Sequence, residues 1–238
     1  MTRRAPRLWS WLPRALVVAL ALPVLGGAGV CGDVLYDTSQ RALILDPLER
    51  VRFTSDGGKV EVYAFDRTAI SLFYYLRGSE HDIGDVGYEL DDPELRAFIL
   101  CDDPSGFCVA DFYVEVPLGT EISAATRNGG VKLTGVDAAV EADVVGGGFE
   151  GIDLGSPMLD VTVDTGDVTA NMVAAPTSVR VAVAVGSVDL TVPAGSYRCE
   201  LQANDGDVTT TGVDCDPMAA ALVKIDVETG DIRLRAAP

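Results

Sequence analysis

The chain has 238 residues, of which 36 are acidic and 18 are basic, giving a formal net charge of −18. Such an acidic surface repels nucleic acid and anionic lipid headgroups, which argues against a nucleic-acid-binding protein. The sequence has one histidine, five cysteines and no C-x-x-C spacing, which argues against a zinc site.

Residues 1–30 have the pattern of an export signal. A basic start is followed by the short apolar run 15–24 and then by small residues, and the run is too short for a membrane span. Four arginines lie in this segment: Arg3, Arg4, Arg7 and Arg14. Without them, 14 basic residues face all 36 acidic ones, so the exported chain carries a net charge of about −22.

Two cleavage sites fit this signal. In one interpretation the segment is a loose lipobox, and Cys31 becomes a lipidated first residue anchored to membrane lipid. In the other, cleavage after Ala28 leaves Cys31 as a free thiol. We favour lipidation of Cys31, because the remaining cysteines then form an even set.

We expect residues 31–50 to be a linker and residues 51–121 to form an irregular, β-rich first part that caps the fold. Within it, residues 78–95 are polar and acidic and predict a surface loop. Ser79, His81 and Asp82 lie in this stretch. Neighbours in a loop do not make a catalytic triad, which depends on preorganised geometry, so we expect His81 to be an exposed loop residue.

Residues 122–238 repeat a short phrase in which a turn glycine is followed by alternating apolar and polar residues. The repeated glycines stand about twenty residues apart: Gly129, Gly147, Gly166, Gly186, Gly206 and Gly230. Glycine permits the positive φ of a tight turn, and alternation places the apolar residues on one face of a strand. A steady period of this length indicates stacked units that bury a core only as an array.

The pattern therefore predicts an all-β fold, a single-stranded β-solenoid with rungs of about 20 residues that forms one continuous domain over residues 51–238. Val168, Val188, Val208 and Ile232 should occupy equivalent inward positions, each touching its counterpart one rung away. An antiparallel β-sandwich with glycine-containing hairpins is the alternative, because regular short strands with turn signals fit it too.

Four cysteines follow Cys31, and an even number in an exported chain suggests two disulfides. Three pairings are possible. We favour the local pairs Cys101–Cys108, which bracket a turn-rich connection, and Cys199–Cys215, which bracket one repeat.

Acidic residues recur beside the turn glycines: Asp164, Asp167, Asp205, Asp207, Glu228 and Asp231. Stacked into a column, they could bind Ca²⁺ through carboxylate oxygens. Asp also flanks Gly because it makes good turns, and the spacing does not match the nonapeptide calcium repeat. We therefore expect a turn role, and the sequence predicts no catalytic residue, metal or cofactor.

The segments 112–120 and 188–195, in which alternating residues lead into Pro-x-Gly, resemble the bacterial putative-adhesin family, as do the Gly-Asp-Val turns. The resemblance covers roughly residues 50–235. It implies a right-handed β-helix of the cell envelope, exported or lipid-anchored, with no catalytic residues to carry over. The four later cysteines and the acidic segment 78–95 depart from the family pattern.

We therefore expect a non-catalytic, lipid-anchored, adhesin-like protein of the bacterial envelope whose partner is a cell-surface glycan or protein. The alternative is a carbohydrate-active β-helix enzyme of the polysaccharide lyase or hydrolase type. Lyases hold acidic sugars in a basic groove, whereas this chain has three lysines among many acids: Lys59, Lys132 and Lys224.

Overall fold

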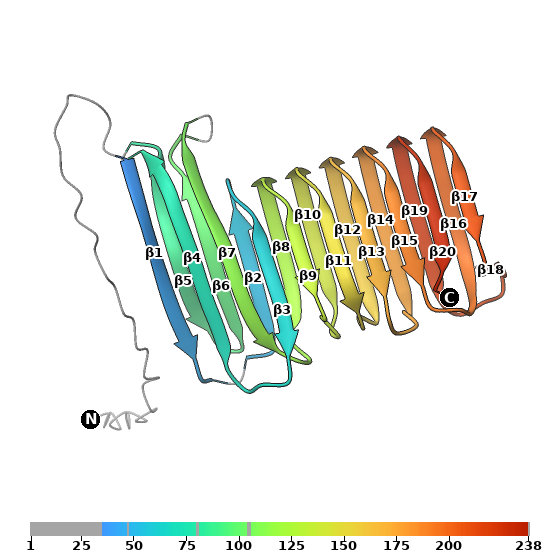
Figure 1. Ribbon diagram of the computed structural model, residues 1–238, viewed down its shortest axis with the longest axis horizontal. Helices are drawn as coiled ribbons and strands as arrows, with labels where there is room; N and C mark the ends of the chain where they lie inside the picture. Colours follow the sequence, from blue (N-terminus) through green and yellow to red (C-terminus); the bar gives the residue numbers. More distant parts are fainter. Residues whose placement is uncertain (1–34, 47, 80, 104–105, 238) are drawn as a thin grey trace, which may run out of the picture.

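Figure 1 shows a computed structural model that describes residues 35–46, 48–79, 81–103 and 106–237. These residues form 20 strands in two ten-stranded, mostly parallel sheets, and they contain no helix. None of the described residues therefore belongs to a helix long and apolar enough to cross a membrane. The all-β prediction is confirmed at this level.

We call the two sheets A and B. Sheet A contains, in spatial order, β1 (Leu35–Ile44), β4 (Ile70–Ser79), β7 (Cys108–Pro117), β3 (Val60–Phe65), β9 (Val131–Thr134), β11 (Phe149–Leu154), β13 (Val168–Met172), β15 (Val188–Val192), β20 (Ile232–Ala236) and β17 (Val208–Thr211). Sheet B contains β18 (Asp214–Cys215), β16 (Ser196–Asp205), β19 (Leu222–Thr229), β14 (Ser178–Val185), β12 (Met158–Thr165), β10 (Val140–Gly146), β8 (Glu121–Asn128), β2 (Arg50–Ser55), β6 (Glu94–Cys101) and β5 (Ile83–Asp91).

The fold is built from pairs of consecutive strands, which we call units, with one strand in each sheet. From β8 onward a glycine turn joins the two strands of a unit. The units from β8–β9 to β14–β15 each pair in parallel with the following unit in both sheets. At Gly166 the turn has φ 146°, and a Cβ atom would overlap the carbonyl oxygen of Gly147 in the neighbouring unit. Glycine is therefore required both by the backbone conformation and by the stacking of turns.

The core lies between the two sheets and is made by the alternate apolar residues of both. Val161 and Val181 of sheet B and Val168 and Val188 of sheet A are at most 3% exposed. Larger rings fill the first part of the stack, where Phe112 of sheet A lies 6.0 Å from Phe53 of sheet B, measured between ring centroids. These rings bury much of the apolar area that stabilises this part of the core.

The units do not stack in sequence order, which corrects the predicted series of inward valines. Val168 does pair with Val188, but Val188 pairs with Ile232, and Ile232 pairs with Val208. The unit β19–β20 thus lies between β14–β15 and β16–β17 (Figure 1). Because β16–β17 is the last unit, Val208 is 44% exposed. At the other end, β2–β3 similarly lies between β6–β7 and β8–β9.

Antiparallel strands close the first part of the chain, and two expectations fail there. The predicted linker 31–50 contains β1, which pairs antiparallel with β4. The predicted surface loop 78–95 contains the end of β4 and most of a hairpin, in which β5 pairs antiparallel with β6. Val86 and Tyr88 of β5 pack against the core, while the charged residues on either side of them, Asp85 and Glu89, are exposed. The polar composition of this segment therefore hid an edge strand.

Candidate functional site

Cys31 and the export signal lie outside the described residues. The other four cysteines form two disulfides. Cys101 of β6 is bonded to Cys108 of β7, with Cα atoms 6.0 Å apart, and Cys199 of β16 is bonded to Cys215 of β18, with Cα atoms 5.4 Å apart. These are the two local pairings that the spacing favours. One disulfide lies near each end of the stack, and such bonds are typical of proteins that fold in an oxidising compartment.

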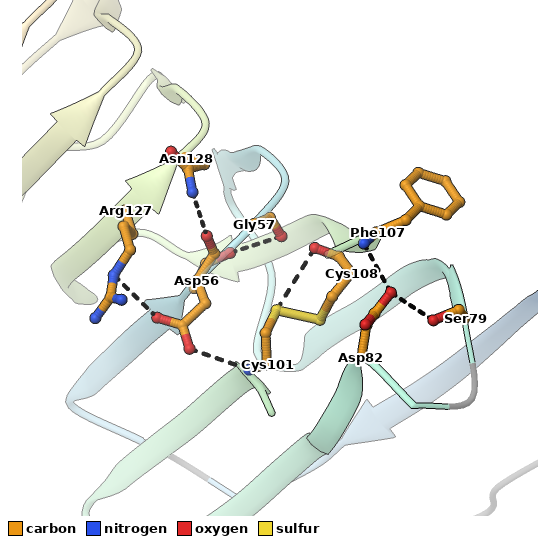
Figure 2. Close-up of a disulfide and its surroundings, with 10 residues drawn as sticks. Asp56, Gly57, Ser79, Asp82, Cys101, Phe107, Cys108, Arg127 and Asn128 are labelled. Carbon is orange, nitrogen blue, oxygen red and sulfur yellow. Dashed lines mark hydrogen bonds and ion pairs between the residues drawn. A yellow bond between two sulfur atoms is a disulfide. The ribbon is translucent and has the colours of Figure 1, made fainter. Parts of the chain in front are cut away.

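Figure 2 shows that the carboxylate of Asp56 joins three units around the first disulfide. It accepts a hydrogen bond from the backbone N–H of Cys101 at 3.0 Å and pairs with the guanidinium of Arg127 at 3.5 Å. The Asn128 side chain donates to the Asp56 carbonyl oxygen. These contacts connect the units β2–β3, β6–β7 and β8–β9.

The Ser79–Asp82 pair nearby is also structural. The Ser79 hydroxyl donates to Asp82, whose carboxylate also accepts the backbone N–H of Phe107 at 2.9 Å (Figure 2). His81 is exposed, as expected, but it lies in the short connection between β4 and β5 rather than in a long loop. Asp82 therefore organises the turn that faces the first disulfide.

The position after each turn glycine forms a column of hydrogen bonds along the last four units. Asp167 accepts the backbone N–H of Ser187 at 2.8 Å, Ser187 accepts that of Asp231 at 3.2 Å, and Asp231 accepts that of Asp207 at 3.1 Å. Each side chain thus satisfies a turn donor of the next unit. This column gives the carboxylates of two calcium candidates, Asp167 and Asp231, a structural role, while Asp207 takes part through its backbone N–H.

The remaining calcium candidates lie apart from that column. Asp164 and Glu228 line a hollow of about 340 Å³ on the outer face of sheet B, and β14 lies between their strands. Asp205 pairs in register with Thr229, one position away from Glu228. Nowhere in the described chain do three His, Cys, Asp or Glu side chains gather in an arrangement that could hold a metal ion.

A second hollow, of about 490 Å³, lies on the outer face of sheet A and was not foreseen from the sequence. Gly130 and Gly148 have no side chain to fill the space between Lys59 and Asp167, so their backbone forms its floor. Charged side chains surround it: Lys59, Glu61, Lys132, Glu150 and Asp167. We call this space the lysine hollow.

The charges in the lysine hollow are paired. The Nζ atom of Lys59 lies 2.5 Å from Glu61, and that of Lys132 lies 2.9 Å from Glu150. Burial alone would raise the pKa of Glu61, but hydrogen bonds from Lys59 and the Tyr63 hydroxyl outweigh it and lower that pKa. The hydrogen bond to Glu150 raises the pKa of Lys132. Both lysines therefore remain charged at neutral pH.

Aromatic side chains adjoin the lysine hollow on the same face of sheet A. The Tyr113 ring lies 5.1 Å from the Nζ atom of Lys59 and 5.9 Å from the ring centroid of Phe73. On β3, the rings of Tyr63 and Phe65 stack with centroids 6.5 Å apart. We call these four residues the aromatic strip. Alternation on β3, β4 and β7 could have indicated it, but the order of these strands in the sheet is not visible in the sequence.

No protein-family model matches the chain, and no curated protein matches it. Solved structures do resemble it. A putative cell adhesion protein from Clostridium sporogenes superposes with a TM-score of 0.51 at 12% identity, covering 85% of this chain and all of that one. A putative adhesin from Bacteroides fragilis gives a TM-score of 0.39 at 11% identity, covering 87% of this chain and 98% of the other. A putative lipid binding protein from Parabacteroides distasonis gives 0.29 at 11% identity, covering 82% and 96%. The first likeness supports a fold shared with the Clostridium sporogenes protein.

Proposed function

We propose that the chain is a right-handed β-helix with rungs of about 20 residues, exported and anchored in the bacterial envelope by a lipid on Cys31. The parallel register, which pairs each residue with its counterpart in the neighbouring unit, supports the helix. The two disulfides and the resemblance to a cell adhesion protein support an extracellular or envelope location.

Within that envelope role, the protein acts as a non-catalytic, adhesin-like surface that contacts a glycan or protein on another cell. The observation that carries this proposal is the aromatic strip beside the lysine hollow on the outer face of sheet A. Partly exposed rings supply contact area at low entropic cost, and adjoining charges orient polar groups of a partner. Aromatic residues of this kind are enriched at binding surfaces.

The lysine hollow also contains the feature that would favour a carbohydrate-active enzyme, namely carboxylates beside basic groups. Glycoside hydrolysis needs one carboxylic acid with a raised pKa to protonate the leaving group. The pKa of Glu61 is instead lowered, because Lys59 and Tyr63 stabilise its charged form. This argues against Glu61 as the general acid of such an enzyme.

A panel of bacterial and host surface polysaccharides and matrix proteins, immobilised and probed with the purified exported domain, tests the function. Tyr113→Ala and Lys132→Gln should each weaken binding to a partner by about tenfold, as loss of one central contact does. Lys224→Gln is the matched control, because Lys224 also pairs with a carboxylate, at 3.4 Å, but lies on sheet B. Equal effects of all three variants, or release of reducing sugar by the parent protein, would contradict the proposal.

The anchor is tested separately on the protein as its own cells produce it. Mass spectrometry of the native N-terminus should find a diacyl or triacyl group on Cys31. An unmodified terminus beginning at Gly29 would rule out the lipid anchor.

A further inference from the structure

The outer side of unit β16–β17 leaves core positions uncovered. Val208 is 44% exposed, whereas Ile232, its register partner in the adjacent unit, is fully buried. Leu201 and Ala203 of β16 point toward the core but are only partly buried. On this side β18 covers β16 at Ser196 and Tyr197 alone, so apolar side chains face solvent at this end of the stack.

The backbone of β16 is free at the same place. The Arg198 N–H donates toward β19, to the carbonyl of Ala221 at 2.8 Å, while the Tyr197 carbonyl accepts the N–H of Asp216 on the opposite side at 2.9 Å. Alternation along the strand therefore directs the backbone groups of Leu201 and Ala203 away from β19. No described strand pairs with them there, and unpaired edge groups are a template for another strand.

The charge of this end selects the kind of strand that can add. Residues 196–216 contain one basic side chain, Arg198, which pairs with Glu200 at 3.5 Å. They contain five acidic ones: Glu200, Asp205, Asp207, Asp214 and Asp216. The same edge of a second copy would be repelled, whereas a cationic segment would be attracted.

We propose that the free edge of β16 is a docking site for an extended segment of a partner protein in which apolar residues alternate with lysine or arginine. The segment adds to sheet B as a further strand. Its apolar side chains cover Leu201 and Ala203, and its basic side chains lie on the outer face beside Glu200. This site lies at the opposite end of the stack from the aromatic strip and does not depend on the proposed adhesin-like role.

The test uses the purified exported domain and two synthetic octapeptides with blocked ends, one of alternating Lys and Val and one of alternating Glu and Val. The lysine peptide should bind in calorimetry and should slow the amide hydrogen exchange of Leu201 and Ala203, measured residue by residue by NMR. The glutamate peptide should not bind. Equal binding of both peptides, or binding without protection of these two amides, would overturn the proposal.

Two variants separate the backbone and charge contributions. Ala203→Pro removes the free N–H of Ala203 without removing a donor to β19, and it should weaken binding of the lysine peptide at least tenfold. Glu200→Gln with Asp205→Asn should weaken binding about three- to tenfold, as loss of two exposed ion pairs does. If Ala203→Pro fails to fold, the variant Glu200→Gln with Asp205→Asn still tests the docking site.

The matched control is Glu141→Gln with Asp143→Asn on β10, which removes the same charge from the same sheet far from the edge. Binding by this control should be unchanged. A loss equal to that of the β16 variant would show that only net charge matters and would overturn the docking site. A concentration-dependent dimer of the parent protein in sedimentation, abolished by Ala203→Pro, would make a second copy the occupant and contradict a basic partner.

Discussion

At the residue scale, the most informative carboxylate outside the turns is Glu94, which lies among three arginines at the start of β6. Arg96 donates to it at 2.7 Å, Arg52 lies at 3.4 Å and Arg50 at 4.0 Å. The hydrogen bond from Arg96, opposed by burial, lowers the pKa of Glu94. Its charged form is therefore preferred in the folded chain.

This shift predicts a loss of stability in acid. Because the pKa of Glu94 is lower in the folded chain, ionised Glu94 stabilises the fold fully above about pH 4.3, the ordinary pKa of Glu. This stabilisation is lost as the pH falls through the folded-state pKa. Because the Glu94–Arg96 pair is partly exposed, Glu94→Gln should lower the free energy of unfolding by only about 1 kcal/mol at pH 7. The same change should flatten the dependence of that free energy on pH below pH 5. Arg96→Gln should flatten this pH dependence in the same way. Chemical denaturation between pH 3 and 7 measures both variants. An unchanged slope in either variant would contradict this assignment.

Val188 and Val208 have the same place in the repeated phrase and different surroundings. Val188 is 1% exposed between two units, so Val188→Asp would bury an unpaired carboxylate at a cost of several kcal/mol. Val208→Asp, at the uncovered end, should cost less than about 1 kcal/mol. Thermal unfolding by far-UV circular dichroism compares the two. If both variants lowered the unfolding midpoint equally, β17 would have to be covered in solution.

Asp189→Asn is the outward control for Val188. Asp189 pairs with Arg235 at 3.0 Å, a contact that the sequence did not reveal, so this change should cost up to about 1 kcal/mol and no more. A loss close to that of Val188→Asp would reverse the inward and outward assignment of β15.

At the scale of the element, the turn glycines combine two constraints that can be separated by substitution. Gly119 has φ 81° and open space around its Cβ position, so Gly119→Ala tests conformation alone and should cost about 1 kcal/mol. Gly166→Ala adds an overlap with the Gly147 carbonyl and should cost about 3 kcal/mol or more. Denaturant midpoints measure both, and equal costs would mean that neighbouring turns are not in contact.

The elements that the sequence predicted are those specified by local chemistry. Gly166 and Gly186 mark turns, and the alternation of Val179, Val181 and Val183 marks a strand with one buried face. The β5 strand was missed because Glu89 and Asp91 resemble loop residues, and only pairing with β6 gives Tyr88 a buried side. Local patterns decide whether a segment is a strand, but not which strand it pairs with.

The lysine hollow and the order of the units were missed for the same reason. Gly130 and Gly148 leave a gap only because β9 and β11 lie between Lys59 and Asp167. Units such as β12–β13 and β14–β15 present similar alternating rows of small apolar residues, so these rows do not specify which units become neighbours. The longer interval between Gly206 and Gly230 is the one local sign that a connection passes over another unit.

At the scale of the whole molecule, the last strands of the chain lie inside the stack. A chain ending at Asp216 would lack β19 and β20 and would therefore lose the strand that pairs with β16 from Arg198 to Asp205. Residues 188–215 should then become protease-sensitive and exchange amide hydrogens freely. Of the described strands, a chain starting at Leu45 would lack β1 alone, an edge strand at the opposite end of sheet A. Amide exchange of residues 188–215 should therefore stay slow in that chain. Equal protection of residues 188–215 in both truncated chains would contradict the observed unit order.

The position of β19–β20 also affects the order in which the units can fold. If the chain crosses the membrane from its N-terminus onward, as the proposed export implies, β16 and β17 reach the folding compartment before β19 and β20. The strands that join β16–β17 to β14–β15 then arrive last. Until then, the free edges of β14 and β15 could pair with β16 and β17 in a misordered stack that resembles the native one in every local contact. Escape from that arrangement requires the pairs to separate again, so the final step of maturation is an exchange of strand partners and should be slow compared with formation of the earlier units.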